Sequence, residues 1–201
     1  MKTLKSVFGA ILLLITFSLS NAQYKTGEMI EDFSLKNIDA KMVSLADFKD
    51  AKGFILVFTC NHCPVAQKYE GRIKELHEKF AKKGYPVVAV NPNDEKVQPQ
   101  DSFEEMKNRA KAQNFKFAYL RDDTQQVARK FGAERTPHVY ILNKTEAGLK
   151  LVYIGAIDNN ADDPNKADKH YVSDAINSLL AGEQLAVNET RAVGCTIKWK
   201  K

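Results

Sequence analysis

The sequence is poor in the residues that cross-link small secreted scaffolds. Only 3 of its 201 residues are cysteine, and it has one tryptophan, 6 prolines and 10 glycines. Three cysteines exclude a disulfide-dense scaffold, so the chain must fold on a hydrophobic core. Hydrophobic residues at 44% and charged residues at 27% are typical of a globular domain and exclude disorder, collagen and coiled coil. The cysteines therefore need an explanation other than dense cross-linking.

Charge and motif content exclude several classes of partner and cofactor. The formal net charge is +5, but Lys2 and Lys5 lie in the N-terminal leader, so the rest of the chain carries 5 − 2 = +3. This charge is weak and dispersed, with no basic stripe, so we predict no nucleic-acid partner. The sequence has no repeat, no glycine-rich phosphate loop and no second closely spaced cysteine pair. We therefore predict no nucleotide, flavin or metal cofactor.

Residues 1–22 have the pattern of a secretory signal peptide. A basic start precedes a mostly apolar run over residues 7–19, and Ser20-Asn21-Ala22 places small residues where a signal peptidase cuts. The apolar run is well short of the ~20 residues that span a bilayer. We therefore expect an exported mature chain, periplasmic or secreted, of 201 − 22 = 179 residues without a membrane span.

The spacing of apolar residues changes along the chain and predicts an α/β fold. Residues 54–58 form an unbroken apolar run, as in a buried strand, whereas 64–83 has an apolar residue every three or four positions, as in an amphipathic helix. The first half of the predicted order is a hairpin within 31–50, strand 54–58, helix 64–83, strand 86–90 and a helix from Asp101 or Ser102 to 114. Strand 117–120 follows, and then a helix that is capped by Asp123 and ends at 131. The last elements are a hairpin of strands 137–142 and 151–155, helix 169–180 and an extended tail over 183–201. Strands that alternate with helices form a covered sheet, and the closing hairpin makes it mixed.

Two cysteines lie where the first buried strand meets the amphipathic helix. Cys60 and Cys63 are three residues apart and Pro64 follows, so both sulfurs can meet in the first helical turn. Free N–H groups at a helix start stabilise a thiolate, which is the species that attacks disulfides. We predict Cys60 as the attacking thiol and Cys63 as the shielded thiol that resolves a mixed disulfide. The alternatives are a static disulfide, two inert core thiols, or a zinc site that lacks a fourth nearby ligand.

The residues between these cysteines shape the predicted site. His62 would help to hold Cys60 as a thiolate and favour the dithiol form, which makes the disulfide more oxidising. The alternative is an exposed loop histidine without a role. Asn61 is permissive at a turn and indicates little by itself.

A proline opens a later strand and completes the predicted site. Thr136-Pro137 begins that strand directly after a helix that ends at Gly132. We interpret Pro137 as a cis-proline that faces the cysteines and leaves the Thr136 backbone free to pair with an extended substrate chain. The alternative is an ordinary residue at a strand start.

The chain resembles the thioredoxin-like redoxins over about residues 27–180. The resembling branch includes alkyl hydroperoxide reductase, thiol-specific antioxidant proteins and periplasmic thiol–disulfide reductases. The motifs that carry the resemblance are Phe33 and Leu35 with Leu45 and Phe48, Cys60-Asn61-His62-Cys63-Pro64, Asn91-Pro92-Asn93-Asp94 and Thr136-Pro137. The tail also resembles the ending of a little-characterised bacterial redoxin subgroup, through Gly194-Cys195-Thr196-Ile197-Lys198-Trp199-Lys200. The resemblance implies a thioredoxin fold with an N-terminal hairpin and an inserted helix, Cys60 as nucleophile, Cys63 as resolving cysteine and Pro137 in cis.

Three departures limit what the resemblance implies. The tryptophan that usually precedes the first cysteine is Thr59 here, which changes part of the partner-binding surface. No buried acid is obvious near the pair, so proton transfer to Cys63 is left to water, His62 or an unplaced residue. Peroxiredoxins need threonine or serine three residues before the peroxidatic cysteine, and that position is Val57 for Cys60 and Cys60 itself for Cys63.

The odd cysteine lies in the C-terminal tail. Cys195, Ile197 and Trp199 alternate, so an extended tail places all three on one face and presses Trp199 onto the body. Cys195 is therefore either a third redox cysteine that reaches the active pair or a buried thiol packed with Trp199.

We predict a thiol–disulfide oxidoreductase with a signal peptide (1–22), a thioredoxin-like domain (23–182) and an extended tail (183–201). Its partners would be protein thiols or disulfides and an upstream redox partner, and the direction of transfer depends on its reduction potential. The rival functions are a peroxiredoxin-like hydroperoxide reductase and a binding module that uses its cysteines structurally.

Overall fold

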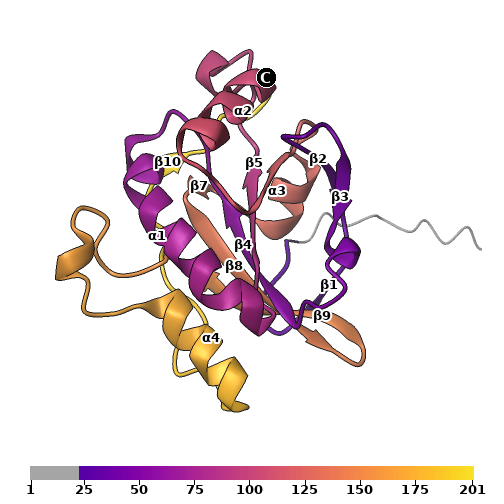
Figure 1. The fold of residues 1–201 in the computed structure, drawn as a ribbon, viewed down its shortest axis with the longest axis vertical. Coiled ribbons are helices and arrows are strands. Elements are labelled where there is room, and N and C mark those ends of the chain that lie inside the picture. Colours follow the sequence, from indigo (N-terminus) through magenta and orange to yellow (C-terminus); the bar gives the residue numbers. More distant parts are fainter. Residues whose placement is uncertain (1–22) are drawn as a thin grey trace, which may run out of the picture.

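The computed structural model describes residues 23–201, so the predicted signal peptide lies outside the described residues. Its centre is an eight-stranded mixed sheet in the order β1-β9-β8-β4-β5-β6-β2-β3 (Figure 1). The strands are β1 (Met29–Ile30), β2 (Ser34–Asn37), β3 (Met42–Ser44), β4 (Gly53–Phe58), β5 (Val87–Asn91), β6 (Ala118–Arg121), β7 (Arg135–Thr136), β8 (His138–Thr145), β9 (Gly148–Gly155) and β10 (Cys195–Thr196). The helices are α1 (Pro64–Phe80), α2 (Phe103–Ala112), α3 (Gln126–Phe131) and α4 (Tyr171–Ala181), with short 3-10 turns at Leu45–Asp47, Ala81–Lys83, Pro99–Asp101 and Pro164–Lys166. Within residues 23–201, no helix is both long and apolar enough to cross a membrane.

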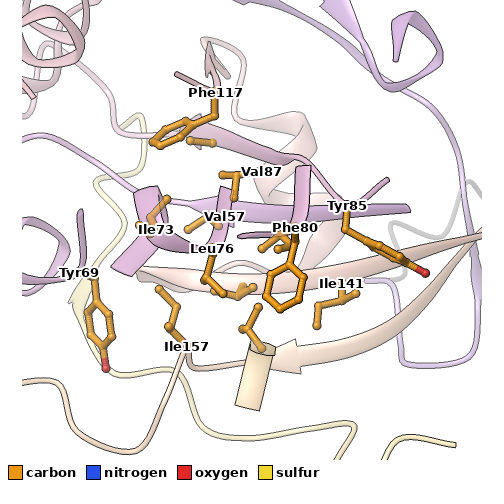
Figure 2. Packing of buried hydrophobic residues seen from close by; sticks show 14 of the residues in the cluster. Val57, Tyr69, Ile73, Leu76, Phe80, Tyr85, Val87, Phe117, Ile141 and Ile157 are labelled. Atoms are coloured by element: carbon orange, nitrogen blue, oxygen red, sulfur yellow. The ribbon is translucent and has the colours of Figure 1, made fainter. Parts of the chain in front are cut away.

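Both faces of the sheet are covered, because its central strands are apolar on both sides. All of β4 is buried, and its alternate residues contribute to two separate clusters. Ile55 and Val57 belong to the cluster that α1, α2 and α4 cover. Figure 2 shows Val57 close to Ile73 and Leu76 of α1. Leu56 and Phe58 pack on the other face with α3 and the N-terminal segment. This two-sided burial fixes the end of β4, from which the first two cysteines extend.

The predicted fold class is confirmed. β4, β5 and β6 run parallel, whereas β8 pairs antiparallel with both β4 and β9, so the sheet is mixed. The N-terminal hairpin is β2 with β3, the closing hairpin is β8 with β9, and α2 is the helix inserted between β5 and β6.

The start of α2 agrees with one of its two predicted caps, whereas the start of α3 differs from the expectation. Ser102 is the N-cap of α2 and accepts the N–H of Glu105, while the Asp101 side chain turns toward the cysteines. The predicted cap at Asp123 is wrong, because Asp122 is the residue that accepts the N–H of Ala128 at the start of α3. Each acid has a polar neighbour in sequence, and the backbone path decides which of the two faces the helix.

The C-terminal tail returns to the body of the protein. β10 pairs antiparallel with β7 in a separate two-stranded sheet, which places Cys195 opposite Thr136. Ile197 is 4% exposed and belongs to the second core cluster, and the Trp199 ring lies 4.3 Å from the Arg129 guanidinium. The predicted packing of alternate tail residues onto the body is confirmed.

Candidate active site

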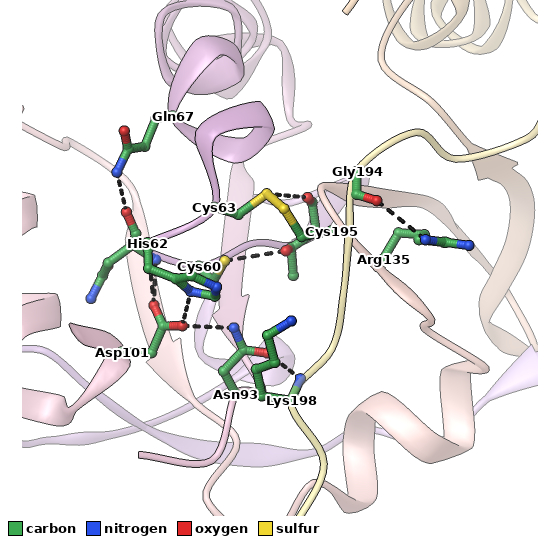
Figure 3. The surroundings of a disulfide bond; sticks show 12 residues. Cys60, His62, Cys63, Gln67, Asn93, Asp101, Arg135, Gly194, Cys195 and Lys198 are labelled. Atoms are coloured by element: carbon green, nitrogen blue, oxygen red, sulfur yellow. Dashed lines mark hydrogen bonds and ion pairs between the residues drawn. A yellow bond between two sulfur atoms is a disulfide. The ribbon is translucent and has the colours of Figure 1, made fainter. Parts of the chain in front are cut away.

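All three cysteines meet at the carboxyl end of β4. Cys60 follows the strand through Thr59, and Cys63 is the N-cap of α1, whose first residue is Pro64. Cys60 is 2% exposed and Cys63 is fully buried. Figure 3 shows a disulfide between Cys63 and Cys195, with Cα atoms 6.1 Å apart, whereas Cys60 is a free thiol.

The predicted pairing of Cys60 with Cys63 is therefore not the one in this structure. The physical reason is the tail: the pairing of β10 with β7 holds Cys195 beside the first turn of α1, where its sulfur replaces that of Cys60 as the partner of Cys63. Of the two readings of Cys195, the structure shows a cysteine that reaches the pair.

Thr136 contacts all three cysteines. Its hydroxyl lies 3.1 Å from the Cys60 sulfur, its carbonyl oxygen lies 3.4 Å from the Cys63 sulfur, and its backbone pairs with Cys195. The Thr136–Pro137 peptide bond is cis, as the resemblance implies, and Thr136 is fully buried. The sequence places Thr136 at this site, but its contact with Cys195 depends on a strand pairing across almost 60 residues of chain, which no local pattern reveals.

A buried acid that the sequence analysis missed lies beside the pair. Asp101 is fully buried at the end of the turn Pro99–Asp101. Its Oδ1 accepts the backbone N–H groups of Asn61 (2.6 Å) and His62 (3.3 Å). Its Oδ2 accepts His62 Nδ1 (2.5 Å) and Asn93 Nδ2 (2.7 Å). Asp101 follows β5, and Cys60 and Cys63 follow β4, which pairs in parallel with β5. Because the carboxyl ends of parallel strands meet at one edge of a sheet, this order of elements is the sequence feature that could have placed Asp101 near the cysteines.

Asn61 fixes the cysteine loop and is more than a permissive turn residue. Its side chain donates to the carbonyl of Gln100 (3.0 Å) and accepts the Tyr119 hydroxyl (2.9 Å). The backbone carbonyl of Asn61 accepts a hydrogen bond from Gln67 Nε2 of α1 (2.6 Å), and Asn61 is 6% exposed. These bonds tie the loop to a second loop, a strand and a helix, so the sulfur positions are held from three sides.

Burial and charge raise the pKa of Cys60 from its ordinary value to about 11. Burial is the larger cause and the Asp101 carboxylate adds to it, while the Thr136 hydroxyl and the backbone N–H groups of Cys63 and His62 oppose the change. The prediction that the helix start stabilises a thiolate on Cys60 does not hold in this state of the protein, because the raised pKa favours the thiol. The N–H groups at the helix start are present, but burial outweighs them.

His62 is the partly buried member of the site. Its side chain is 13% exposed, and its Nδ1–H donates to Asp101. This bond leaves Nε2 as the ring nitrogen that can exchange a proton. Cys60, His62 and Asp101 each offer one ligand atom within 4.8 Å of the others. Both Asp101 oxygens already accept two N–H donors each, so this carboxylate is satisfied without a cation.

The loop motif of the family resemblance holds the tail. The backbone of Lys198 donates to Asn93 Oδ1 and accepts the N–H of Asp94, each at 2.8 Å. Gln125 donates to the Lys198 carbonyl at 2.9 Å. Gly194 runs so close to β7 that an added Cβ would lie 2.2 Å from the Thr136 carbonyl oxygen. The tail is thus seated by several backbone contacts as well as by the disulfide.

Solved structures share this fold over most of the chain. An uncharacterized conserved protein from Geobacillus kaustophilus is 33% identical, with a TM-score of 0.81 over 89% of this chain and 94% of that one. The thioredoxin domain of a thiol-disulfide oxidoreductase from Bacteroides vulgatus has the same fold at 18% identity, with a TM-score of 0.54 over 66% of this chain and 89% of that one.

Curated relatives and a family model also match this chain. A chloroplastic peroxiredoxin Q from Suaeda salsa is 27% identical over 154 residues, which cover 72% of this chain and 64% of that protein. The chain thus spans less than two thirds of that relative. The model of the AhpC/TSA family matches residues 26–148, more than half of the chain. With its thioredoxin-like fold, the chain belongs to the AhpC/TSA family of redoxins.

Proposed function

We propose that this chain is an exported thiol–disulfide oxidoreductase that exchanges a Cys60–Cys63 disulfide with protein thiols. The observation that supports the proposal most directly is the position of Cys60 and Cys63 at the end of β4. Their sulfurs lie against the hydroxyl and the carbonyl of Thr136, which precedes the cis-proline Pro137. An extended partner segment would pair with this backbone and present its own cysteine to Cys60. An upstream redox partner would then restore the starting state.

In the reducing direction, Cys60 begins the exchange. Its thiolate attacks a partner disulfide, one partner sulfur leaves as a thiolate, and a mixed disulfide remains on Cys60. The Cys63 thiolate then attacks Cys60 Sγ, which forms the Cys60–Cys63 disulfide and releases the second partner sulfur. Two electrons pass to the partner, and the oxidising direction reverses the same steps.

His62 and Asp101 are suited to handle the protons of this exchange. Asp101 holds the imidazole by its Nδ1–H, so that Nε2 can accept or return a proton near the sulfurs. Asp101 is close enough to raise the pKa of Cys60 and fully buried. We assign His62 and Asp101 as positioning residues for proton transfer.

Reduction of insulin disulfides with dithiothreitol tests the proposal. We expect Cys60→Ser and Cys63→Ser to lose at least about a hundredfold in rate, since nucleophilic catalysis ends with the loss of either thiol. Asn177→Ala, at an exposed position of α4, is the control and retains the wild-type rate. Equal rates for wild type and Cys60→Ser would instead favour a binding module that uses its cysteines structurally.

Hydroperoxide reduction is a second candidate, because the curated relatives include proteins named peroxiredoxin Q. Val57 stands where peroxiredoxins need threonine or serine, which opposes it. Stopped-flow mixing of the reduced protein with micromolar hydrogen peroxide separates the two functions. Rapid oxidation of Cys60 would favour the peroxidase, and slow oxidation with rapid insulin reduction would favour the oxidoreductase.

A further inference from the structure

The C-terminal tail occupies the place that a partner segment needs. Cys195 pairs with Thr136 through the backbone, and Thr136 is the residue that an extended substrate would use. Cys60 is 2% exposed and Cys63 is fully buried with the tail in place. In this state neither sulfur is open to a partner thiol.

The three sulfurs lie in one small cluster. Cys60 and Cys63 form a buried group with Ala66, and Cys195 packs against it. The Cys60 and Cys63 sulfurs contact the hydroxyl and the carbonyl of the same residue, Thr136. The free thiol is thus a near neighbour of a disulfide that is already formed, which is the arrangement that thiol–disulfide exchange requires.

We propose that Cys195 is a third catalytic thiol, and that Cys63–Cys195 and Cys60–Cys63 are two interconverting disulfides of one oxidised protein. This inference rests on the proposed function and adds a route between the tail and the pair. In the tail-linked state the partner-binding backbone is covered, and in the pair-linked state Cys195 is free and the tail can leave β7.

The exchange balances without an added oxidant or reductant. The Cys60 thiolate attacks Cys63 Sγ, the Cys63–Cys195 bond breaks as the Cys60–Cys63 bond forms, and Cys195 leaves as a thiolate. Cys195 takes up the proton that Cys60 has lost. One disulfide and one thiol stand on each side, so the step is an isomerisation.

Peptide mapping of the oxidised wild-type chain tests the isomerisation directly. The protein is oxidised to one disulfide per chain, denatured at acidic pH, labelled with N-ethylmaleimide and cut with trypsin. Cys60 and Cys63 share peptide 53–68, whereas Cys195 lies on peptide 192–198. The tail-linked state gives the two peptides joined with label on Cys60. The pair-linked state gives an internally bridged 53–68 with label on Cys195.

We expect both patterns in one preparation, with a ratio that returns to the same value after partial reduction and reoxidation. A single pattern under all conditions would overturn the inference, as would a Cys60–Cys195 linkage, because the proposed attack is on Cys63. This readout does not use insulin. Both patterns without insulin reduction would leave the isomerisation standing and the proposed function refuted, and one pattern with insulin reduction would do the opposite.

A glycine substitution shifts the ratio while it keeps every thiol. In Gly194→Ala the new Cβ would meet the Thr136 carbonyl, a backbone atom that cannot move aside cheaply. We expect the ratio to move toward the pair-linked state by roughly fivefold or more, as for an overpacked contact. Gly71→Ala, where an added Cβ meets no atom within 4 Å, is the matched control and keeps the wild-type ratio. An unchanged ratio in Gly194→Ala would contradict the coupling of tail seating to the disulfide.

Discussion

At the scale of single residues, Asp101 sets the charge around the free thiol. It is fully buried, it accepts four N–H groups from the cysteine loop and Asn93, and its charge is the second cause of the raised pKa of Cys60. The same carboxylate therefore holds the cysteine loop in place and disfavours the thiolate form of Cys60.

We expect Asp101→Asn to lower the pKa of Cys60 from about 11 without bringing it below the ordinary value of 9.0, because burial is the larger cause and remains. The pH dependence of alkylation of Cys60 in the tail-linked protein, read on peptide 53–68, measures this change. Thr136→Val removes a hydrogen bond that lowers this pKa, so its shift has the opposite sign. Shifts of the same sign in both variants would contradict this account of the electrostatics.

His138 is a second residue whose burial has a measurable consequence. It is half-buried in β8, and burial lowers its pKa from 6.5 to about 4. The unfolded chain therefore binds a proton between pH 6.5 and 4 that the folded chain does not, so this histidine weakens the fold as pH falls through that window. The effect is at most about 3–4 kcal/mol, at about 1.4 kcal/mol per pKa unit.

We expect His138→Gln to remove that part of the pH dependence of unfolding. Urea unfolding of wild type and variant at several pH values measures it, and the difference between their unfolding free energies should change from pH 6.5 to pH 4 and stay constant above pH 7. A constant difference across the whole range would show that His138 titrates normally in the folded protein.

Local patterns predict the cysteines and Pro137 but not the acid beside them. Cys60 and Cys63 stand out by spacing and by their position between a strand and a helix, and Pro137 by the strand that it opens. Asp101 has the local pattern of a helix cap, and its actual role depends on two loops meeting at the end of a parallel pair. Residue types report what a side chain can do, whereas which of several neighbours does it depends on tertiary contacts.

At the scale of elements, the two-residue strand β10 is held by the contacts of the tail residues that follow it. A pair of residues has little pairing energy of its own, but Ile197 is 4% exposed in the second core cluster, and its N–H donates to the Glu134 carbonyl at 3.1 Å. Long elements such as β4 and α1 carry their own periodicity and were predictable. β10 was predictable only as an extended tail, because its partner β7 is remote in sequence.

We expect Ile197→Ala to lower the free energy of unfolding of the oxidised protein by about 2–4 kcal/mol, as for loss of a buried isoleucine side chain. Urea unfolding measures the change. Val187→Ala, at a position 44% exposed in the same tail, should stay within about 0.5 kcal/mol of wild type. Equal effects of the two substitutions would mean that the tail is not anchored through Ile197.

At the scale of the whole molecule, the state of the disulfide changes how the chain is connected. The Cys63–Cys195 bond spans a sequence separation of 132 residues and closes most of the chain into one loop. A Cys60–Cys63 bond closes a loop of only a few residues. Because loop closure removes entropy from the unfolded chain in proportion to the logarithm of loop length, the two disulfides differ in stabilisation.

For the tail-linked wild type we expect oxidation to raise the free energy of unfolding by up to about 5 kcal/mol, and for Cys195→Ser, which can form only the short loop, by about 2 kcal/mol. Each protein is compared with its own reduced form by urea unfolding, so the loss of the Cys195 side chain cancels. The difference between the two gains then isolates the covalent attachment of the tail. Equal gains would mean that oxidised wild type holds mainly the short loop, and the tail would then be free to leave β7 even in the oxidised protein.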